Sequence, residues 1–219
     1  MRILRRIVLG IAGVAMVASL TAPSVSGQTR GGSGMMDKMP PAGPAGTTGE
    51  MMTKDQKITN AMTAAPASVA AKATVLDWPA KEGEAPAVLR PGSNGWSCLP
   101  DMPDTQGNDP TCLDKPWMTW VAAYLAHKAP QVSSVGIGYM TAPGGAWGSN
   151  TDPYAMSKAS DNQWGLHQPH VMILVPDLKS LQAISTDPNN GGPYVMYAGT
   201  PYAHIMAPIA DAKMMGMGK

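Results

Sequence analysis

Two of the four histidines in this chain stand where strands are expected to begin and a third lies just ahead of one, and imidazole is the commonest metal ligand among side chains. His167 and His170 flank a Gln-Pro pair before the most apolar run of the chain, and His204 opens a later apolar run. If these two runs pair side by side, we expect His170 and His204 to meet at one end of a sheet, with His167 reaching in from the preceding loop. The three imidazoles, or two of them with Asp152, would form a zinc or copper site.

Two other interpretations of the same histidines stay open. Two His residues three positions apart share a face only in a helix, and Pro169 disfavours a helix at that point. Each ring would then simply hydrogen-bond a nearby backbone carbonyl at a strand end. Alternatively, His170 or His204 would act with an aspartate as the general base of a hydrolase-like enzyme.

The 18 methionines are a second set of candidate metal ligands, because thioether sulfur is a soft donor that suits Cu(I). Clusters of them stand outside the expected domain. These clusters would bind copper, belong to an inert spacer, or buffer the protein against oxidation. The chain contains no Phe, so methionines inside the domain are expected to fill core volume. The outer clusters are Met35, Met36, Met39, Met51, Met52, Met214, Met215 and Met217, and the inner ones are Met140, Met172, Met196 and Met206.

Motifs for other kinds of catalysis are missing from the sequence. There is no GxSxG nucleophile elbow, and no glycine loop in a strand–turn–helix context that would cradle a phosphate. Glutamates occur only at Glu50, Glu82 and Glu84. We therefore assign no catalytic residue, and we expect a non-catalytic domain that binds a small molecule or a metal ion, with a structural or envelope-associated protein as a further alternative.

The segment 141–168 is long, rich in Gly and polar residues, and without clear hydrophobic periodicity. Irregular segments of that length often carry function. Trp147 and Trp164 within it, with Tyr202 further on, are candidates for a surface that binds a small ligand. The alternative is that the indole rings pack inward and hold the loop in place.

The two cysteines, Cys98 and Cys112, flank the turn-rich loop LPDMPDTQGNDPT. Such a pair predicts a disulfide in an oxidising compartment. Metal and redox pairs favour the shorter CxxC spacing. Closing a loop of about 15 residues would contribute about 3 kcal/mol to stability.

The N-terminus has the three-part pattern of a secretory signal peptide, predicted over residues 1–27. Arg2, Arg5 and Arg6 precede the apolar run 7–20, and small residues follow. The run is shorter than the roughly 20 residues of a membrane span, and no second long apolar run follows it. We expect a periplasmic or secreted protein with no membrane segment after cleavage, exported by the Sec or the twin-arginine route; a retained N-terminal anchor is the alternative.

Charge points to no particular partner. Removing Arg2, Arg5 and Arg6 from the 16 basic residues leaves 13, against 15 acidic ones. A nucleic-acid-binding protein normally carries a basic patch, and none stands out, so we expect no nucleic-acid partner. The sequence identifies no protein partner.

Composition divides the remainder of the chain into three parts. Residues 28–70 are rich in Met, Pro, Gly and Ala without apolar periodicity, which predicts a disordered spacer. A folded domain is expected over 71–210 and a disordered tail over 211–219.

The expected elements indicate an α+β fold. Strands are predicted at 73–78, 87–90, 132–140, 170–176, 194–197 and 204–209, and a short helix at 178–184. A longer helix begins after Asp114, with Pro116 in its first turn, and presents an apolar stripe formed by Trp117, Trp120, Val121 and Tyr124. We predict a single compact α+β domain, with a largely antiparallel sheet covered by one principal helix and preceded by a disordered spacer.

Several segments of the domain resemble a group of uncharacterised secreted bacterial proteins. The resemblance is carried by GSNGWSCLPD, TCLDKPWMTW, SNTDP, PHVMILVP and GGPYVMYAGTPYAHIM. It covers the whole expected domain but not the spacer. It implies a common fold, and it implies no activity.

Overall fold

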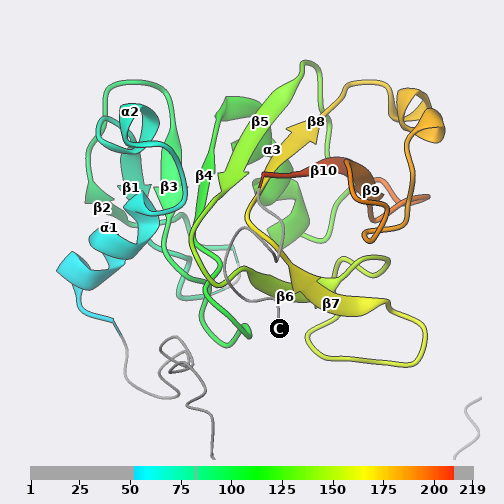
Figure 1. Ribbon diagram of the computed structural model, residues 1–219. Helices are drawn as coiled ribbons and strands as arrows, with labels where there is room; N and C mark the ends of the chain where they lie inside the picture. Colours follow the sequence, from blue (N-terminus) through cyan, green and yellow to red (C-terminus); the bar gives the residue numbers. More distant parts are fainter. Residues whose placement is uncertain (1–51, 82, 210–219) are drawn as a thin grey trace, which may run out of the picture. The chain divides into compact units, whose positions relative to one another are not determined.

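The computed structural model describes residues 52–81 and 83–209 (Figure 1). The predicted signal peptide, the spacer up to residue 51 and the predicted tail at 211–219 lie outside the described residues.

The described domain is built on a sheet of eight strands in the order β2-β1-β3-β4-β5-β8-β10-β9 (Figure 1). Strands β1 and β3 are parallel to each other, and every other neighbouring pair in this sheet is antiparallel. The prediction of an α+β fold with a largely antiparallel sheet is confirmed. The strands are β1 (Thr74–Leu76), β2 (Val88–Arg90), β3 (Ser97–Leu99), β4 (Thr111–Leu113), β5 (Gly136–Met140), β8 (His170–Leu174), β9 (Tyr194–Met196) and β10 (His204–Pro208).

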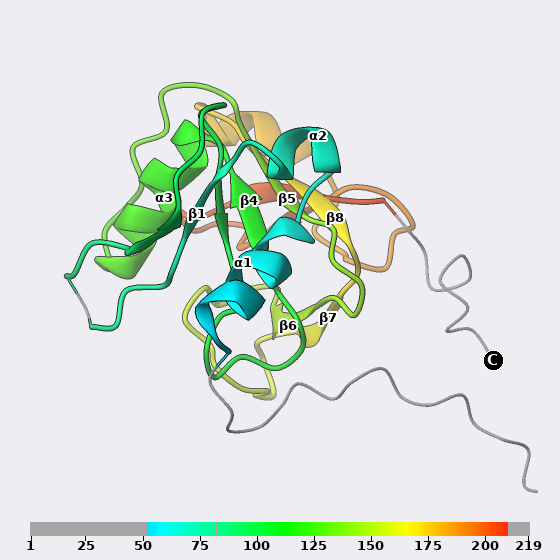
Figure 2. The ribbon, with the colours of Figure 1, turned by 90° about the vertical axis from the view of Figure 1, so that its left-hand side faces the viewer.

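Helix α3 (Lys115–Leu125) covers one face of this sheet, and helices α1 (Lys54–Met62) and α2 (Ala67–Ala70) lie on the other side (Figure 2). The N-cap of α3 is Asp114. One oxygen of its carboxylate accepts a hydrogen bond from the backbone N–H of Trp117, and the other accepts one from the backbone N–H of Ile137 on β5. This carboxylate therefore fixes both the start of the helix and its position on the sheet. Trp117 and Trp120 are buried, as the apolar stripe predicts.

The folded domain begins earlier than the sequence predicts. Helices α1 (Lys54–Met62) and α2 (Ala67–Ala70) fall within the predicted spacer, yet Ala61 and Ala64 are fully buried beside β3 and β4. The Lys57 ammonium also forms a salt bridge of 2.7 Å to Asp77. The predicted boundary at residue 71 is wrong because alanine side chains give no strong periodicity, although their small size permits close packing.

The predicted disulfide between Cys98 and Cys112 is confirmed. The two residues face each other directly on the antiparallel strands β3 and β4, and both are fully buried. Residues of α1 and the segment after it cover the bond.

The segment predicted to be one long irregular loop contains a separate two-stranded ribbon, β6 (Ala146–Ser149) with β7 (Trp164–His167). Gly144 and Gly145 take positive φ angles at its start, which a side chain would disfavour. The ribbon was missed because glycines interrupt both strands, so that neither shows the usual alternation.

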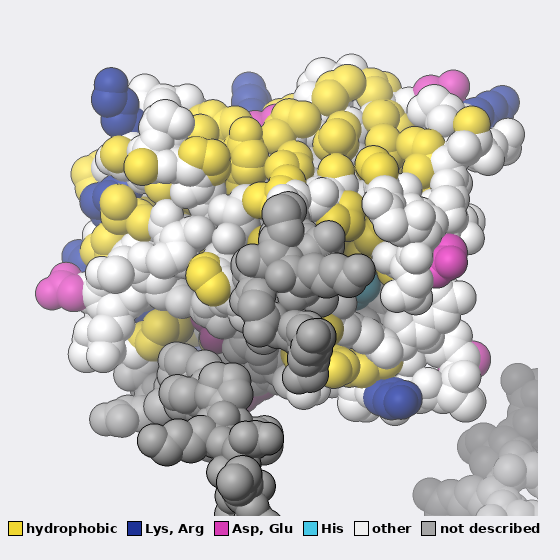
Figure 3. Space-filling model, in the orientation of Figure 1, with side chains coloured by type: hydrophobic (Ala, Val, Ile, Leu, Met, Phe, Trp, Pro, Cys, Tyr) yellow, Lys and Arg dark blue, Asp and Glu magenta, His cyan; other side chains and the backbone are white. Residues whose placement is uncertain are grey.

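The sheet face opposite α3 carries a row of half-buried apolar side chains. Ile137, Ile173 and Ile205 lie side by side on β5, β8 and β10. Hydrophobic side chains are seen gathered over this part of the sheet in Figure 3. At the β9 end of that face, the short 3-10 helix η1 (Leu178–Ala183) packs Leu181 against Val195.

Candidate functional site

The sheet face under α3 brings together buried histidines and methionines. Cross-strand partners share a face of a sheet. Met196 pairs with His204, and Met206 pairs with Met172 on one side and with Tyr194 on the other. We call the following set the His/Met layer: His170, Met172, Met196, His204 and Met206 of the sheet, together with His167 of β7.

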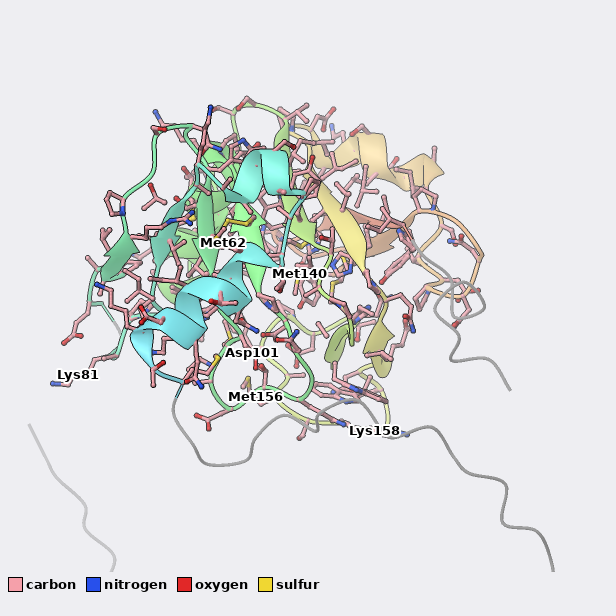
Figure 4. All side chains as sticks on the ribbon, turned by 60° about the vertical axis from the view of Figure 1, so that its left-hand side comes forward. Met62, Lys81, Asp101, Met140, Met156 and Lys158 are labelled. Atoms are coloured by element: carbon pink, nitrogen blue, oxygen red, sulfur yellow. A yellow bond between two sulfur atoms is a disulfide. The ribbon has the colours of Figure 1, made fainter. Side chains whose placement is uncertain are left out.

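The methionines of the domain differ in their surroundings. Met172 and Met196 are each 7 % exposed, whereas Met156, in the loop between β6 and β7, is 63 % exposed. Met140 pairs with His170 at the margin of the layer. Figure 4 shows Met140 inside the domain and Met156 toward its periphery.

His170 and His204 are held in the same way. The Nδ1 atom of His170 donates to the carbonyl of Gln168 (2.6 Å), and that of His204 donates to the carbonyl of Tyr202 (3.0 Å). A carbonyl can only accept, so Nδ1 carries the proton and Nε2 presents a free lone pair. Both rings are 2 % exposed, and neither Nε2 has a hydrogen-bond partner.

His167 reaches the layer from the β6–β7 ribbon. Its Nδ1 shares a hydrogen bond of 2.8 Å with the hydroxyl of Tyr194, and its Nε2 is also buried without a partner. A Cβ built on Gly148 would lie 3.5 Å from that Nε2 and 4.0 Å from the Cε methyl of Met196. The missing side chain of Gly148 thus leaves a small space between His167 and Met196.

Burial keeps these imidazoles neutral. It lowers the pKa of His170 to about 3 and that of His204 to about 4. Burial also lowers the pKa of His167, and a contact of this ring with the backbone of Gly148, too poorly aligned to count as a hydrogen bond, acts in the opposite direction. Proximity adds a smaller effect in the same direction, because His167 lowers the pKa of both His170 and His204, and His204 also lowers that of His170. The neutral ring is the form that binds metal ions.

The prediction that His170 and His204 meet at one end of the sheet is wrong. Both rings lie on the same face, but His170 pairs with Pro208, whereas His204 stands just beyond the pair formed by Ile205 and Ile173. Each histidine begins its strand, and antiparallel neighbours begin at opposite ends. Four residues of strand, roughly 13 Å, therefore separate their backbones. The two rings still lie close enough for His204 to lower the pKa of His170, and His167 lowers the pKa of both.

Asp152 does not join the histidines. It is exposed, its carboxylate accepts a hydrogen bond of 2.9 Å from the backbone N–H of Tyr154, and its own N–H donates to the hydroxyl of Ser149. It shapes a turn after β6. Within the part of the chain that the structure describes, no group of three or more His, Cys, Asp or Glu side chains is placed to hold a metal ion.

Aromatic rings enclose His204. The ring centroids of Trp117 and Trp120 lie 5.1 and 5.7 Å from that of the imidazole, and Tyr197 lies at 5.5 Å. Tyr202, predicted as part of a ligand surface, is 7 % exposed, and its hydroxyl donates to the carbonyl of Lys128. Its position is that of a core residue.

The two loop tryptophans lie together on one face of the ribbon. Trp147 pairs with Leu166 and Trp164 pairs with Ser149, so both indoles lie on the ribbon face opposite His167. Trp147 is 36 % exposed and Trp164 is half-buried. A hollow of about 580 Å³ lies elsewhere, between η1 and β9, and none of the predicted ligand residues lines it.

Sequence reasoning missed the layer as a whole, although a signal for it exists. The strands HVM and HIM repeat one pattern, with His and Met two positions apart and hence on one face of a strand. Tyr194 and Met196 have the same spacing on β9. These methionines were predicted only to fill core volume, so their position beside the imidazoles was missed.

Within the described residues, none of the helices has both the length and the apolar character needed to cross a membrane. Comparisons with protein-family models, with curated proteins and with solved structures found no match.

Proposed function

We propose that this domain is an exported binding protein for a transition-metal ion, which imidazole Nε2 atoms hold within the His/Met layer. The observation that carries the proposal is the set of three buried Nε2 atoms, on His167, His170 and His204, without hydrogen-bond partners. A buried polar atom left unsatisfied costs about 1–3 kcal/mol. A bound metal ion would satisfy the Nε2 atoms of those rings that hold it.

The hydrogen bonds of the rings favour this reading over a general base. Metal-ligating histidines usually donate their other ring nitrogen to a carbonyl or carboxylate, which fixes the tautomer. His170 and His204 donate to carbonyls in this way. A general base needs access to substrate, and both rings are 2 % exposed.

Export is supported by two features of different kinds. The N-terminal sequence has a basic, then apolar, then small-residue pattern. The bonded pair Cys98 and Cys112 is typical of proteins from oxidising compartments.

Equilibrium dialysis of the purified, chelator-treated protein against Zn(II), and anaerobically against Cu(I), tests the proposal. We expect a bound ion in the wild type and at least about tenfold weaker binding when His167, His170 and His204 are all changed to Gln. The matched control is His127→Gln, because His127 is exposed and stacks on Tyr154 outside the layer.

A second readout does not depend on the variants being well folded. An ion that binds only the native state should raise the unfolding free energy of the wild type by about 2.7 kcal/mol at 100 times its Kd. A wild type that binds no ion, or a triple variant that binds as tightly as His127→Gln, would contradict the proposal.

A further inference from the structure

The donors other than imidazole decide which ion fits the layer. A structural zinc site takes four ligands from Cys, His, Asp and Glu. Among the described residues no three such side chains are placed around one point. The remaining donors inside the layer are the thioethers of Met172, Met196 and Met206, all 7 % exposed or less. Thioether sulfur is soft and selects Cu(I).

Met196 is the thioether of the layer that neighbours both His204 and the space beside His167. It is the direct cross-strand partner of His204 on the same face of the sheet. Its methyl group and the Nε2 of His167 both line the space beside Gly148. Strands β7, β9 and β10 thus bring two nitrogen donors and one sulfur donor to one end of the layer.

The backbone at Gly148 does not require a glycine. Its φ lies outside the left-handed region, and an added Cβ would meet its neighbours at ordinary contact distances of 3.5–4.0 Å. The consequence of glycine here is the open space next to the Nε2 of His167.

We infer that the Nε2 atoms of His167 and His204 and the Sδ atom of Met196 form a Cu(I) site beside Gly148. The inference rests on the proposed function and narrows it to one ion, one oxidation state and three ligands. His170, at the other end of the β8–β10 ladder, lies outside this ligand set.

Gly148→Ala tests the space directly. The added methyl group fits the fold but fills the gap between His167 and Met196. Gly165→Ala is the matched control, because Gly165 pairs with Gly148 across the ribbon and its added Cβ would meet nothing within 4 Å. In anaerobic competition with a chromogenic Cu(I) chelator, Gly148→Ala should weaken Cu(I) binding about tenfold or more, and Gly165→Ala should leave it unchanged.

Met196→Leu tests the sulfur ligand. It keeps the side-chain volume close to native, so the fold should persist. We expect it to weaken binding of Cu(I), and of Ag(I) as a redox-inert substitute, about tenfold or more, with no effect on Zn(II). Met172→Leu is the control in the same layer. X-ray absorption of the Cu(I) protein should detect a sulfur ligand in the wild type and none in Met196→Leu.

The outcomes separate this inference from the proposal on which it rests. If the triple His variant loses the ion while Gly148→Ala and Met196→Leu bind Cu(I) like the wild type, the ligand assignment is overturned and metal binding stands. If His170→Gln weakens Cu(I) binding as much as His204→Gln, the ligand set is wrong. If the wild type binds neither Cu(I) nor Zn(II), both fail.

Discussion

His170 and His204 make the same local hydrogen bond, from Nδ1 to the carbonyl two residues earlier, although they begin strands that run in opposite directions. In both cases the chain ahead of the strand supplies the acceptor, and the ring is then pinned with Nε2 facing the buried layer. The shared arrangement means that one change of pH acts on both rings alike.

Stability should rise as the pH increases from about 4 to about 6.5. Burial lowers the pKa of His170 to about 3 and that of His204 to about 4, whereas each titrates near 6.5 in the unfolded chain. Over this window the unfolded chain binds more protons than the native state, so acid favours unfolding. Each ring contributes about 1.4 kcal/mol per pH unit while it is protonated only in the unfolded chain. Urea denaturation at a series of pH values measures the slope.

Asp109 has the opposite effect on the pH dependence of stability, and its substitution serves as a control for the histidines. Burial, with a hydrogen bond to Asp101, raises the pKa of Asp109 to about 7. The native state therefore binds more protons than the unfolded chain between about pH 4 and 7, which lowers stability as the pH rises. Asp109→Asn should steepen the rise in stability, and His204→Gln should flatten it. A wild type whose stability falls steadily from pH 4.5 to 6 would show that the histidines are not buried as neutral rings.

The helix on the sheet should be the most sensitive part of the core. Trp120 is 7 % exposed and packs against Tyr124, Tyr202 and His204. Trp120→Ala should lower the unfolding free energy by about 3–5 kcal/mol, the usual loss for a buried large aromatic residue. Trp147→Ala, at a 36 % exposed indole, should cost much less. Equal losses in the two variants would mean that Trp120 is not part of the core.

Local sequence signals predicted the helices and strands of this fold better than they predicted how the strands pair. Asp114, Pro116 and the tryptophan stripe identify α3 because capping and amphipathic spacing act within a few residues. The relative position of His170 and His204 depends instead on how two strands pair. No local pattern indicates that β8 and β10 are antiparallel neighbours. Because they are, the two strands begin at opposite ends of the sheet.

The N-terminal helices show a second limit of local reasoning. The alanines of α1 and α2 are weakly apolar, so the composition resembles that of a linker. Their burial follows from tertiary fit, because only a small side chain can approach the disulfide and the backbone of β3 and β4 closely. The capping box at Thr53 and Gln56 is the signal that could have located the first helix.

A chain that begins at residue 71 should be less stable than one that begins at residue 52. The shorter chain lacks the alanines that cover Cys98 and Cys112, and it also lacks the salt bridge between Lys57 and Asp77. Exposing that apolar surface should lower the thermal midpoint by several degrees, since 1 kcal/mol shifts it by about 2–4 °C in a domain of this size. Equal midpoints for the two chains, measured by circular dichroism, would place α1 and α2 outside the cooperative unit.

The disulfide should resist reduction in the native protein. Both cysteines are fully buried, so a reductant reaches them only when the covering segment opens or the domain unfolds. Thiol titration after treatment with dithiothreitol should find few free thiols in buffer and two per chain in denaturant. Replacing both cysteines with Ala should cost about 2–5 kcal/mol. Rapid reduction in buffer, at a rate independent of denaturant, would show that residues 52–70 do not protect the bond.

Tyr194 should act as a positioning residue for His167. Its hydroxyl lies 2.8 Å from Nδ1 of His167, and Tyr194 is itself buried on β9 beside Met206. Tyr194→Phe keeps the ring but leaves Nδ1 without its partner, which should lower the unfolding free energy by about 1–3 kcal/mol. Because the hydrogen bond also orients the ring, the variant should bind metal about 10–100-fold more weakly. Tyr139→Phe is the control, since Tyr139 lies on the other face of the sheet. A merely structural role predicts lost stability with unchanged affinity in a folded sample, so measuring both quantities on the same preparation separates packing from positioning.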